Sequence, residues 1–204
     1  MEIYIILTDT GTLLSKMIGV YTKYPLNHTS VSFEKNLQTV YSFGRKKPHN
    51  PFIGGFVKEN LQDAFFKGAY CEIYSCSITP IQYELMQSYI NQIEEEQKKY
   101  KYNLLGLLGI PLNKNIKRKN ALFCSQFVAA TFNYGGISIV NKPANFTMPR
   151  DFAETTNLNL LYAGLLRGYL ANSPENSSEI NVRGQAINTA CSLQWDERPF
   201  TLTL

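Results

Sequence analysis

Covalent chemistry in this chain is most readily assigned to a cysteine at the start of an apolar helix. The segment Phe123-Cys124-Ser125-Gln126-Phe127-Val128 places Cys124 in the first turn of a helix that the apolar pattern predicts over residues 123–134. The free N–H groups and partial positive charge of a helix start favour thiolate over thiol, and the thiolate is the nucleophilic form. The same N–H groups can form half of an oxyanion hole. Taken alone, the segment is also typical of a buried structural cysteine.

A histidine on an earlier strand provides the base that such a nucleophile needs. The chain has 2 histidines. His28 begins an alternating segment that predicts a strand over residues 28–33, whereas His49 lies in a Gly- and Pro-rich loop. In the predicted mechanism, Cys124 attacks an amide, ester or thioester carbonyl. His28 takes the thiol proton and later protonates the leaving group.

The elements that must position this pair are those of one α+β domain. Length and apolar content, 204 residues with 44% hydrophobic, suit a single core. The patterns predict a small antiparallel sheet of about five strands, with the nucleophile helix packed against it. Strands are expected at residues 2–8, 28–33, 38–43, 70–78 and 158–166, and helices at 10–21, 79–99, 103–110, 123–134 and 148–152. In the helix that Thr79 and Pro80 begin, the predicted apolar face carries Ile81, Leu85, Tyr89 and Ile93.

The stretch from Gly44 to Lys58 is predicted to be an irregular loop over the cleft, because it is rich in Gly, Pro and Lys. The residues expected to contact substrate therefore lie in or beside this loop or next to the nucleophile: Tyr41, Phe43, Arg45, Phe56 and Ser125. Arg45 can pair with a substrate carboxylate in a bidentate geometry, and a plain surface arginine is the alternative.

The amino-acid composition limits the classes of binding partner that we expect for this chain. The net charge of +4 is compatible with anionic ligands but is common in proteins that bind none. The basic run KNIKRK is short and lacks interleaved aromatics, so no nucleic-acid partner is expected. With 4 cysteines, no CxxC pair and two histidines, we expect no metal and no cofactor. The N-terminal segment has no signal-peptide pattern, so a cytoplasmic location with reduced thiols is expected. Membrane contact is possible but not expected.

The C-terminal residues differ in character from the rest of the chain. Residues 171–204 are polar, rich in Ser and Asn, and without clear periodicity. The catalytic domain is therefore predicted to span residues 1–170. The remainder is either a native arm or an appended segment.

The order of these motifs resembles that of the permuted NlpC/P60, papain-like superfamily, in particular the YiiX-type proteins. The segment His28-Thr29-Ser30-Val31-Ser32-Phe33 resembles its histidine strand, and Phe123-Cys124-Ser125-Gln126-Phe127-Val128 resembles its nucleophile helix. In this group the histidine strand precedes the cysteine helix, an order that lecithin retinol acyltransferase-like proteins share. The likeness covers residues 2–170 and implies a permuted papain-like fold.

The resemblance also implies a third polar residue that orients the histidine from the next strand. Hairpin register puts that position near Tyr41 or Ser42, and we predict Ser42, with a backbone carbonyl or a loop residue as alternatives. A second oxyanion donor is expected near Thr8 to Thr12.

Three functions are open at this point. The first is a peptidase or amidase that cleaves an amide or isopeptide bond of a peptide-like substrate through an acyl-enzyme. The second is a lipid-directed acyltransferase or thioesterase on the same fold. The third is a catalytically silent ligand-binding module. The sequence leaves the oligomeric state undetermined.

Overall fold

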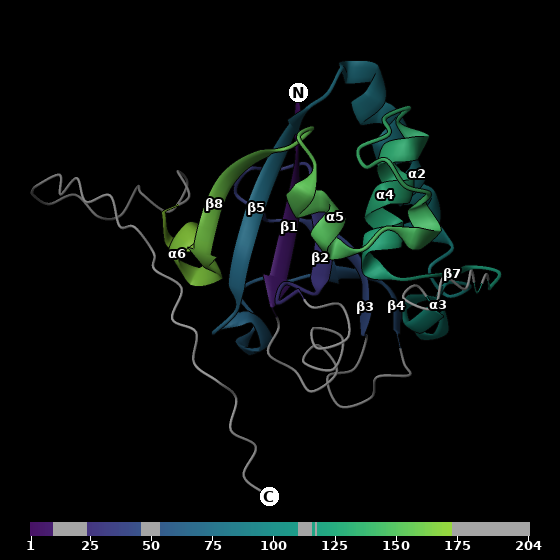
Figure 1. The fold of residues 1–204 in the computed structure, drawn as a ribbon, viewed down its shortest axis with the longest axis horizontal. Coiled ribbons are helices and arrows are strands. Elements are labelled where there is room, and N and C mark those ends of the chain that lie inside the picture. The colour runs from purple at the N-terminus through teal and green to yellow at the C-terminus, as the bar shows by residue number, and fades with distance from the viewer. Residues whose placement is uncertain (10–23, 46–53, 110–115, 117, 173–204) are drawn as a thin grey trace, which may run out of the picture.

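The computed structural model describes residues 1–9, 24–45, 54–109, 116 and 118–172, without the side chains of Arg45 and Leu108. The fold of this part is α+β (Figure 1). Its main sheet has six antiparallel strands in the order β4-β3-β2-β1-β5-β8. Their bounds are β1 Glu2–Asp9, β2 His28–Ser32, β3 Val40–Arg45, β4 Gly54–Glu59, β5 Tyr70–Ser77 and β8 Asn159–Leu165. The predicted α+β class and antiparallel sheet are confirmed, with one strand more than expected.

Helices cover the sheet, and α4 packs directly on β2 and β3, with α2 beyond it (Figure 1). The helices are α2 Pro80–Glu95, α3 Leu104–Gly109, α4 Cys124–Tyr134, α5 Pro149–Glu154 and α6 Leu166–Ala171, with short 3₁₀ helices η1 Ala64–Phe66 and η3 Ala144–Phe146. A two-stranded parallel ribbon, β6 Lys101–Tyr102 and β7 Ala121–Leu122, lies between α2 and α4 in the chain. The helix predicted over residues 10–21 and the segment 173–204 lie outside the described residues.

The central strand β1 explains why the sheet has a core on each face. Successive side chains of a strand point to opposite faces, and the apolar run from Ile3 to Leu7 is buried throughout. Ile3, Ile5 and Leu7 pack in the larger core with Phe127 and Phe132 of α4, whereas Tyr4 and Ile6 pack in the smaller core on the other face. Helix α4 is thus held by the larger core.

Helix α2 begins as predicted but buries a different face. Thr79 is the N-cap: its hydroxyl accepts from the Gln82 N–H, and the Gln82 side chain accepts from the Thr79 N–H. Ile81 and Leu85 are 72% and 40% exposed, so their assignment to the apolar face was wrong. The buried residues are Met86, Ile90 and Ile93. The cause is the close approach of α4, since a Cβ on Gly135 would lie 2.6 Å from Met86 Cε.

The predicted loop of residues 44–58 contains a strand, which corrects the loop assignment. β4 pairs with all of β3, from Arg45 opposite Gly54 to Val40 opposite Glu59. Glycine here serves close packing, because a Cβ on Gly54 would lie 2.7 Å from the Gly44 carbonyl oxygen. Residues 46–53 lie outside the described part of the chain.

This pairing also buries two of the expected substrate contacts. Phe43 and Phe56 are core residues, 0% and 2% exposed, so their assignment as substrate contacts was wrong. Tyr41 is half-buried: its ring stacks on Phe56 with centroids 6.1 Å apart, and the Lys58 ammonium lies 5.7 Å from its centroid.

Substitution of Phe127 is expected to test how strongly the larger core supports the helix. Its ring is fully buried, and its centroid lies 5.2 Å from that of Phe43 and 5.9 Å from that of Phe56. Phe127→Ala should lower the free energy of unfolding by about 3–5 kcal/mol, because it leaves a cavity. Leu105→Ala, at a side chain that is 54% exposed, is the control and should change little. Equal urea midpoints for the two variants would contradict this packing.

Candidate active site

The nucleophile candidate Cys124 is the first residue of α4 and is 1% exposed. The residue before it, Phe123, has an extended backbone and is buried against Leu107, so the chain enters the helix in a fixed direction. The Ser125 hydroxyl donates to the Thr147 carbonyl oxygen at 2.7 Å and holds the first turn from the other side. The backbone N–H groups of Ser125 and Thr29 hydrogen-bond to the sulfur of Cys124.

The base candidate His28 is the first residue of β2 and hydrogen-bonds to Cys124. Its position follows from strand pairing, in which His28 lies opposite Thr8 of the central strand. Its Nε2 lies 2.6 Å from Glu59 Oε1. Since Nε2 is taken by Glu59, Nδ1 is the ring nitrogen left for the thiol. The structure therefore brings together the two residues that the sequence singled out.

Glu59, the last residue of β4, is the group that orients the imidazole, and sequence reasoning missed it. The same oxygen that binds His28 also accepts a hydrogen bond of 2.6 Å from the Ser42 hydroxyl. Ser42 was expected to bond the imidazole itself; that expectation was wrong, since its hydroxyl donates to Glu59. Glu59 could have been found by searching the residues between His28 and the strand predicted at residues 70–78 for acids, which number three: Glu34, Glu59 and Asp63.

Burial and charge together set the protonation states of this site. Burial would lower the pKa of His28, but the Glu59 charge and the hydrogen bonds to Cys124 and Glu59 outweigh it and raise that pKa well above its usual range. Burial would raise the pKa of Glu59, yet the charge of His28 and its hydrogen bond, with that of Ser42, hold it below its usual value.

The pKa of the Cys124 thiol is shifted in the opposite direction from the pKa of His28. Burial would raise the pKa of Cys124, but the hydrogen bond and charge of His28 and the two backbone N–H groups lower it. A lowered thiol pKa beside a raised imidazole pKa favours the thiolate–imidazolium pair. Such a pair is a nucleophile with its proton donor already in place.

Several buried hydroxyls around the site have no hydrogen-bond partner among the described residues. They include Thr8 Oγ1, Thr29 Oγ1 and Ser30 Oγ, and Glu59 Oε2 is likewise without one. Ser30 lies close enough to help lower the pKa of Glu59, although it makes no hydrogen bond of standard geometry. Of the expected oxyanion region Thr8 to Thr12, residues 10–12 lie outside the described part.

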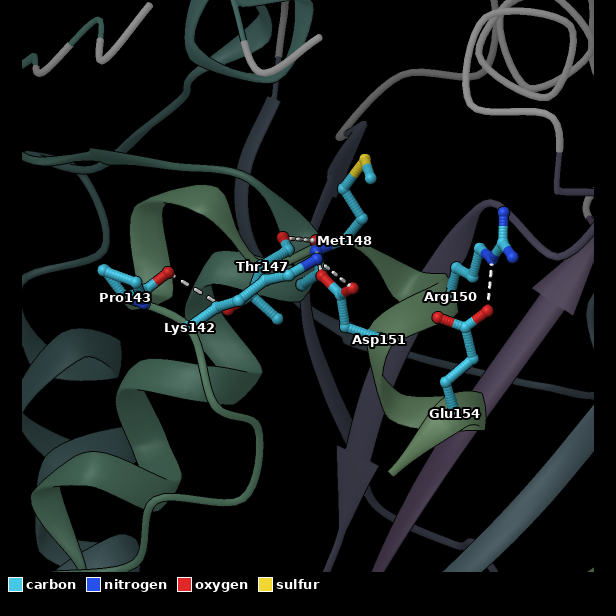
Figure 2. A network of polar contacts seen from close by, with 8 residues as sticks. Lys142, Pro143, Thr147, Met148, Arg150, Asp151 and Glu154 are labelled. Atoms are coloured by element: carbon cyan, nitrogen blue, oxygen red, sulfur yellow. Dashed lines mark hydrogen bonds and ion pairs between the residues drawn. The ribbon is translucent and has the colours of Figure 1, made fainter. Parts of the chain in front are cut away.

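Polar contacts hold together the segment that follows α4, from Lys142 to Glu154 (Figure 2). Asp151 accepts from the Met148 N–H at 2.8 Å and pairs with the Lys142 ammonium at 2.5 Å. Thr147, whose carbonyl oxygen receives the Ser125 hydroxyl, lies directly before Met148. The expectation that the Ser125 side chain contacts substrate was therefore wrong, because its hydroxyl is buried and engaged. The side chain of Arg45 lies outside the described residues.

No protein-family model, curated protein or solved structure matches the chain. Among the described residues, no cluster of three or more His, Cys, Asp or Glu could hold a metal ion. Within the same residues, no helix has both the length and the apolar character needed to cross a membrane.

Removing the Glu59 charge is expected to raise the pKa of Cys124. In Glu59→Gln, a neutral amide stabilises the imidazolium less, so the thiol pKa should rise by about one unit or more. The measurement is the ultraviolet thiolate absorbance as a function of pH, taken as the difference from the matching Cys124→Ser protein. Lys58→Gln, on the same strand but exposed and paired with Glu94, should leave the titration unchanged. Identical titrations for Glu59→Gln and the unsubstituted protein would refute the assignment of Glu59.

The buried His28–Glu59 pair is expected to stabilise the fold within a defined pH window. Because the pKa of Glu59 is lowered, its ionised carboxylate stabilises the fold above pH 4.5, the ordinary pKa of a glutamate. This stability is lost as the pH falls through the lowered pKa of Glu59. Because the pKa of His28 is raised, its protonated ring contributes its full stability below pH 6.5, the ordinary pKa of a histidine. This stability is lost as the pH rises through the raised pKa of His28.

Inside this window, at about pH 6, Glu59→Gln should lower the free energy of unfolding by about 3–5 kcal/mol, because it removes the carboxylate that compensates the charge of the His28 imidazolium. Urea unfolding over a pH series measures the loss. A penalty that does not shrink at alkaline pH would contradict the role of His28 protonation.

Proposed function

We propose that the chain is a cysteine hydrolase of the peptidase or amidase type, built on a permuted papain-like fold. The observation that carries the proposal is the continuous series of contacts from Cys124 through His28 to Glu59. A nucleophile, a base and an orienting acid in this order form the arrangement used for acyl transfer. The antiparallel sheet, with the histidine strand before the cysteine helix, supports the permuted assignment.

The proposed reaction proceeds through an acyl-enzyme. The Cys124 thiolate attacks the substrate carbonyl carbon, and the carbonyl oxygen takes the negative charge near the start of α4. The carbon–nitrogen bond breaks as His28 gives its proton to the leaving amine. The resulting thioester is hydrolysed by a water whose proton passes to His28, which restores the thiolate–imidazolium pair and releases a carboxylic acid.

Glu59 and Ser42 act through His28 in this scheme. Glu59 keeps Nε2 engaged, so that Nδ1 serves the sulfur and the leaving group. Ser42, buried and donating to Glu59, fixes the carboxylate. The completed series of contacts favours catalysis over a silent binding module. The lipid-directed alternative stays a prediction, and so does a cytoplasmic location.

A carbonyl-directed covalent probe, such as a peptidyl acyloxymethyl ketone, tests the nucleophile. In a Cys191→Ala background, the protein should be labelled at Cys124, and Cys124→Ala should abolish the label. Cys71→Ala is the matched control, because Cys71 is buried with its pKa raised to about 12 and should not react. His28→Ala should slow labelling by about 10²–10⁴-fold, the usual contribution of a general base. Equal labelling of the Cys124→Ala and background proteins would end the proposal.

A further inference from the structure

A cavity lies beside the first turn of α4, the helix that begins at Cys124. It has a volume of about 400 Å³, and its walls come from α2, α3, the β7 segment, the first turns of α4 and η3. This size falls in the lower part of the range for small-molecule sites. Gln126 lines the cavity two residues after Cys124, which places the two side chains about 200° apart around the helix. The cavity is therefore separate from the thiol.

Two buried polar atoms in the walls have no partner among the described residues. They are the carbonyl oxygen Oε1 of Gln126 and the amide nitrogen Nδ2 of Asn145. Nearly all buried polar groups in native proteins are paired, so each unpaired one calls for an explanation. The nearby Asn103 is satisfied, since its Nδ2 donates to the Ile116 carbonyl oxygen and its Oδ1 accepts from the Gly106 N–H. The cavity walls thus contain one acceptor without a donor, Gln126 Oε1, and one donor without an acceptor, Asn145 Nδ2.

The described side chains that line the cavity carry positive charge and no negative charge. Arg118 lines the cavity with an exposed side chain and has no ion-pair partner within the described part of the chain. None of the described lining residues is acidic. Arg118 belongs to the basic run KNIKRK, which the proposed catalytic site does not use. Tyr89 and Tyr100 add aromatic surface, so the cavity offers a cation, the amide groups of Gln126 and Asn145, and apolar contact.

We propose that this cavity binds a short peptide-like ligand with a free carboxylate. A secondary amide carries both missing partners: once the Gln126 and Asn145 side chains turn toward the cavity, its N–H donates to Gln126 Oε1 and its carbonyl accepts from Asn145 Nδ2. The guanidinium of Arg118 binds the carboxylate, a pairing that favours bidentate geometry. The ligand sits against the helix that begins at Cys124, and its binding does not require the proposed chemistry of that residue.

The test uses N-acetyl-alanyl-alanine and its C-terminal carboxamide as probes, titrated into the full chain carrying Cys124→Ala so that no turnover intervenes. NMR chemical shifts should show saturable binding of the acid, and the carboxamide should bind about tenfold more weakly, because it lacks the charge-assisted hydrogen bond. Arg118→Gln, an exposed and therefore foldable variant, should remove this difference. Lys119→Gln, the neighbouring exposed cation that does not line the cavity, should preserve it.

Gln126→Leu should weaken both probes by about tenfold, because it removes the acceptor for the ligand amide while keeping the side-chain volume. The proposal is overturned if neither probe binds at about 10 mM, or if the acid and carboxamide bind alike. It is also overturned if the shifts centre on His28 and Glu59, which would place the ligand at the thiol. Because every titration uses Cys124→Ala, the outcome is independent of whether Cys124 is a nucleophile.

Discussion

One oxygen atom of a buried carboxylate holds the candidate site together. Glu59 Oε1 receives both the His28 ring and the Ser42 hydroxyl at 2.6 Å. Removing a carboxylate from water is costly unless hydrogen bonds and an opposite charge compensate for it. Here three strands, β2, β3 and β4, each supply one of the groups that meet at this atom, so the sheet register and the protonation state of the site depend on each other.

The larger core determines where the sulfur meets this network. Phe127 of α4 contacts Phe43 of β3 and Phe56 of β4, so the helix that bears Cys124 is packed on the strands that carry Ser42 and Glu59. Aromatic packing of this kind fixes orientation as well as burial. The alternation of these strands places apolar rings on one face and the polar pair Ser42 and Glu59 on the other. Stability and site geometry are thereby built from the same strands.

Local patterns in the sequence were sufficient for most elements and for two of the three site residues. The apolar helix behind Cys124, the strand beginning at His28 and the Thr79 cap all depend on residues close together in the chain. Glu59 could not be found in this way, because it meets His28 only through sheet pairing across 31 residues. Gly54 resembles a loop residue, whereas its lack of a side chain serves close packing against Gly44 of β3. The buried face of α2 was missed for a similar reason, since the contact with Gly135 selects Met86.

The position of β4 at the margin of the sheet has a consequence for how the candidate site would be disrupted. Within the six-stranded sheet β4 pairs only with β3, while β1 is paired on both sides. Marginal strands open in local fluctuations at a lower free energy than the centre of a domain. Each such opening withdraws Glu59 from His28 while the core around β1 stays intact. Heating should therefore break the contact between His28 and Glu59 before it unfolds the domain, and backbone amides of β4 should exchange with solvent faster than those of β1.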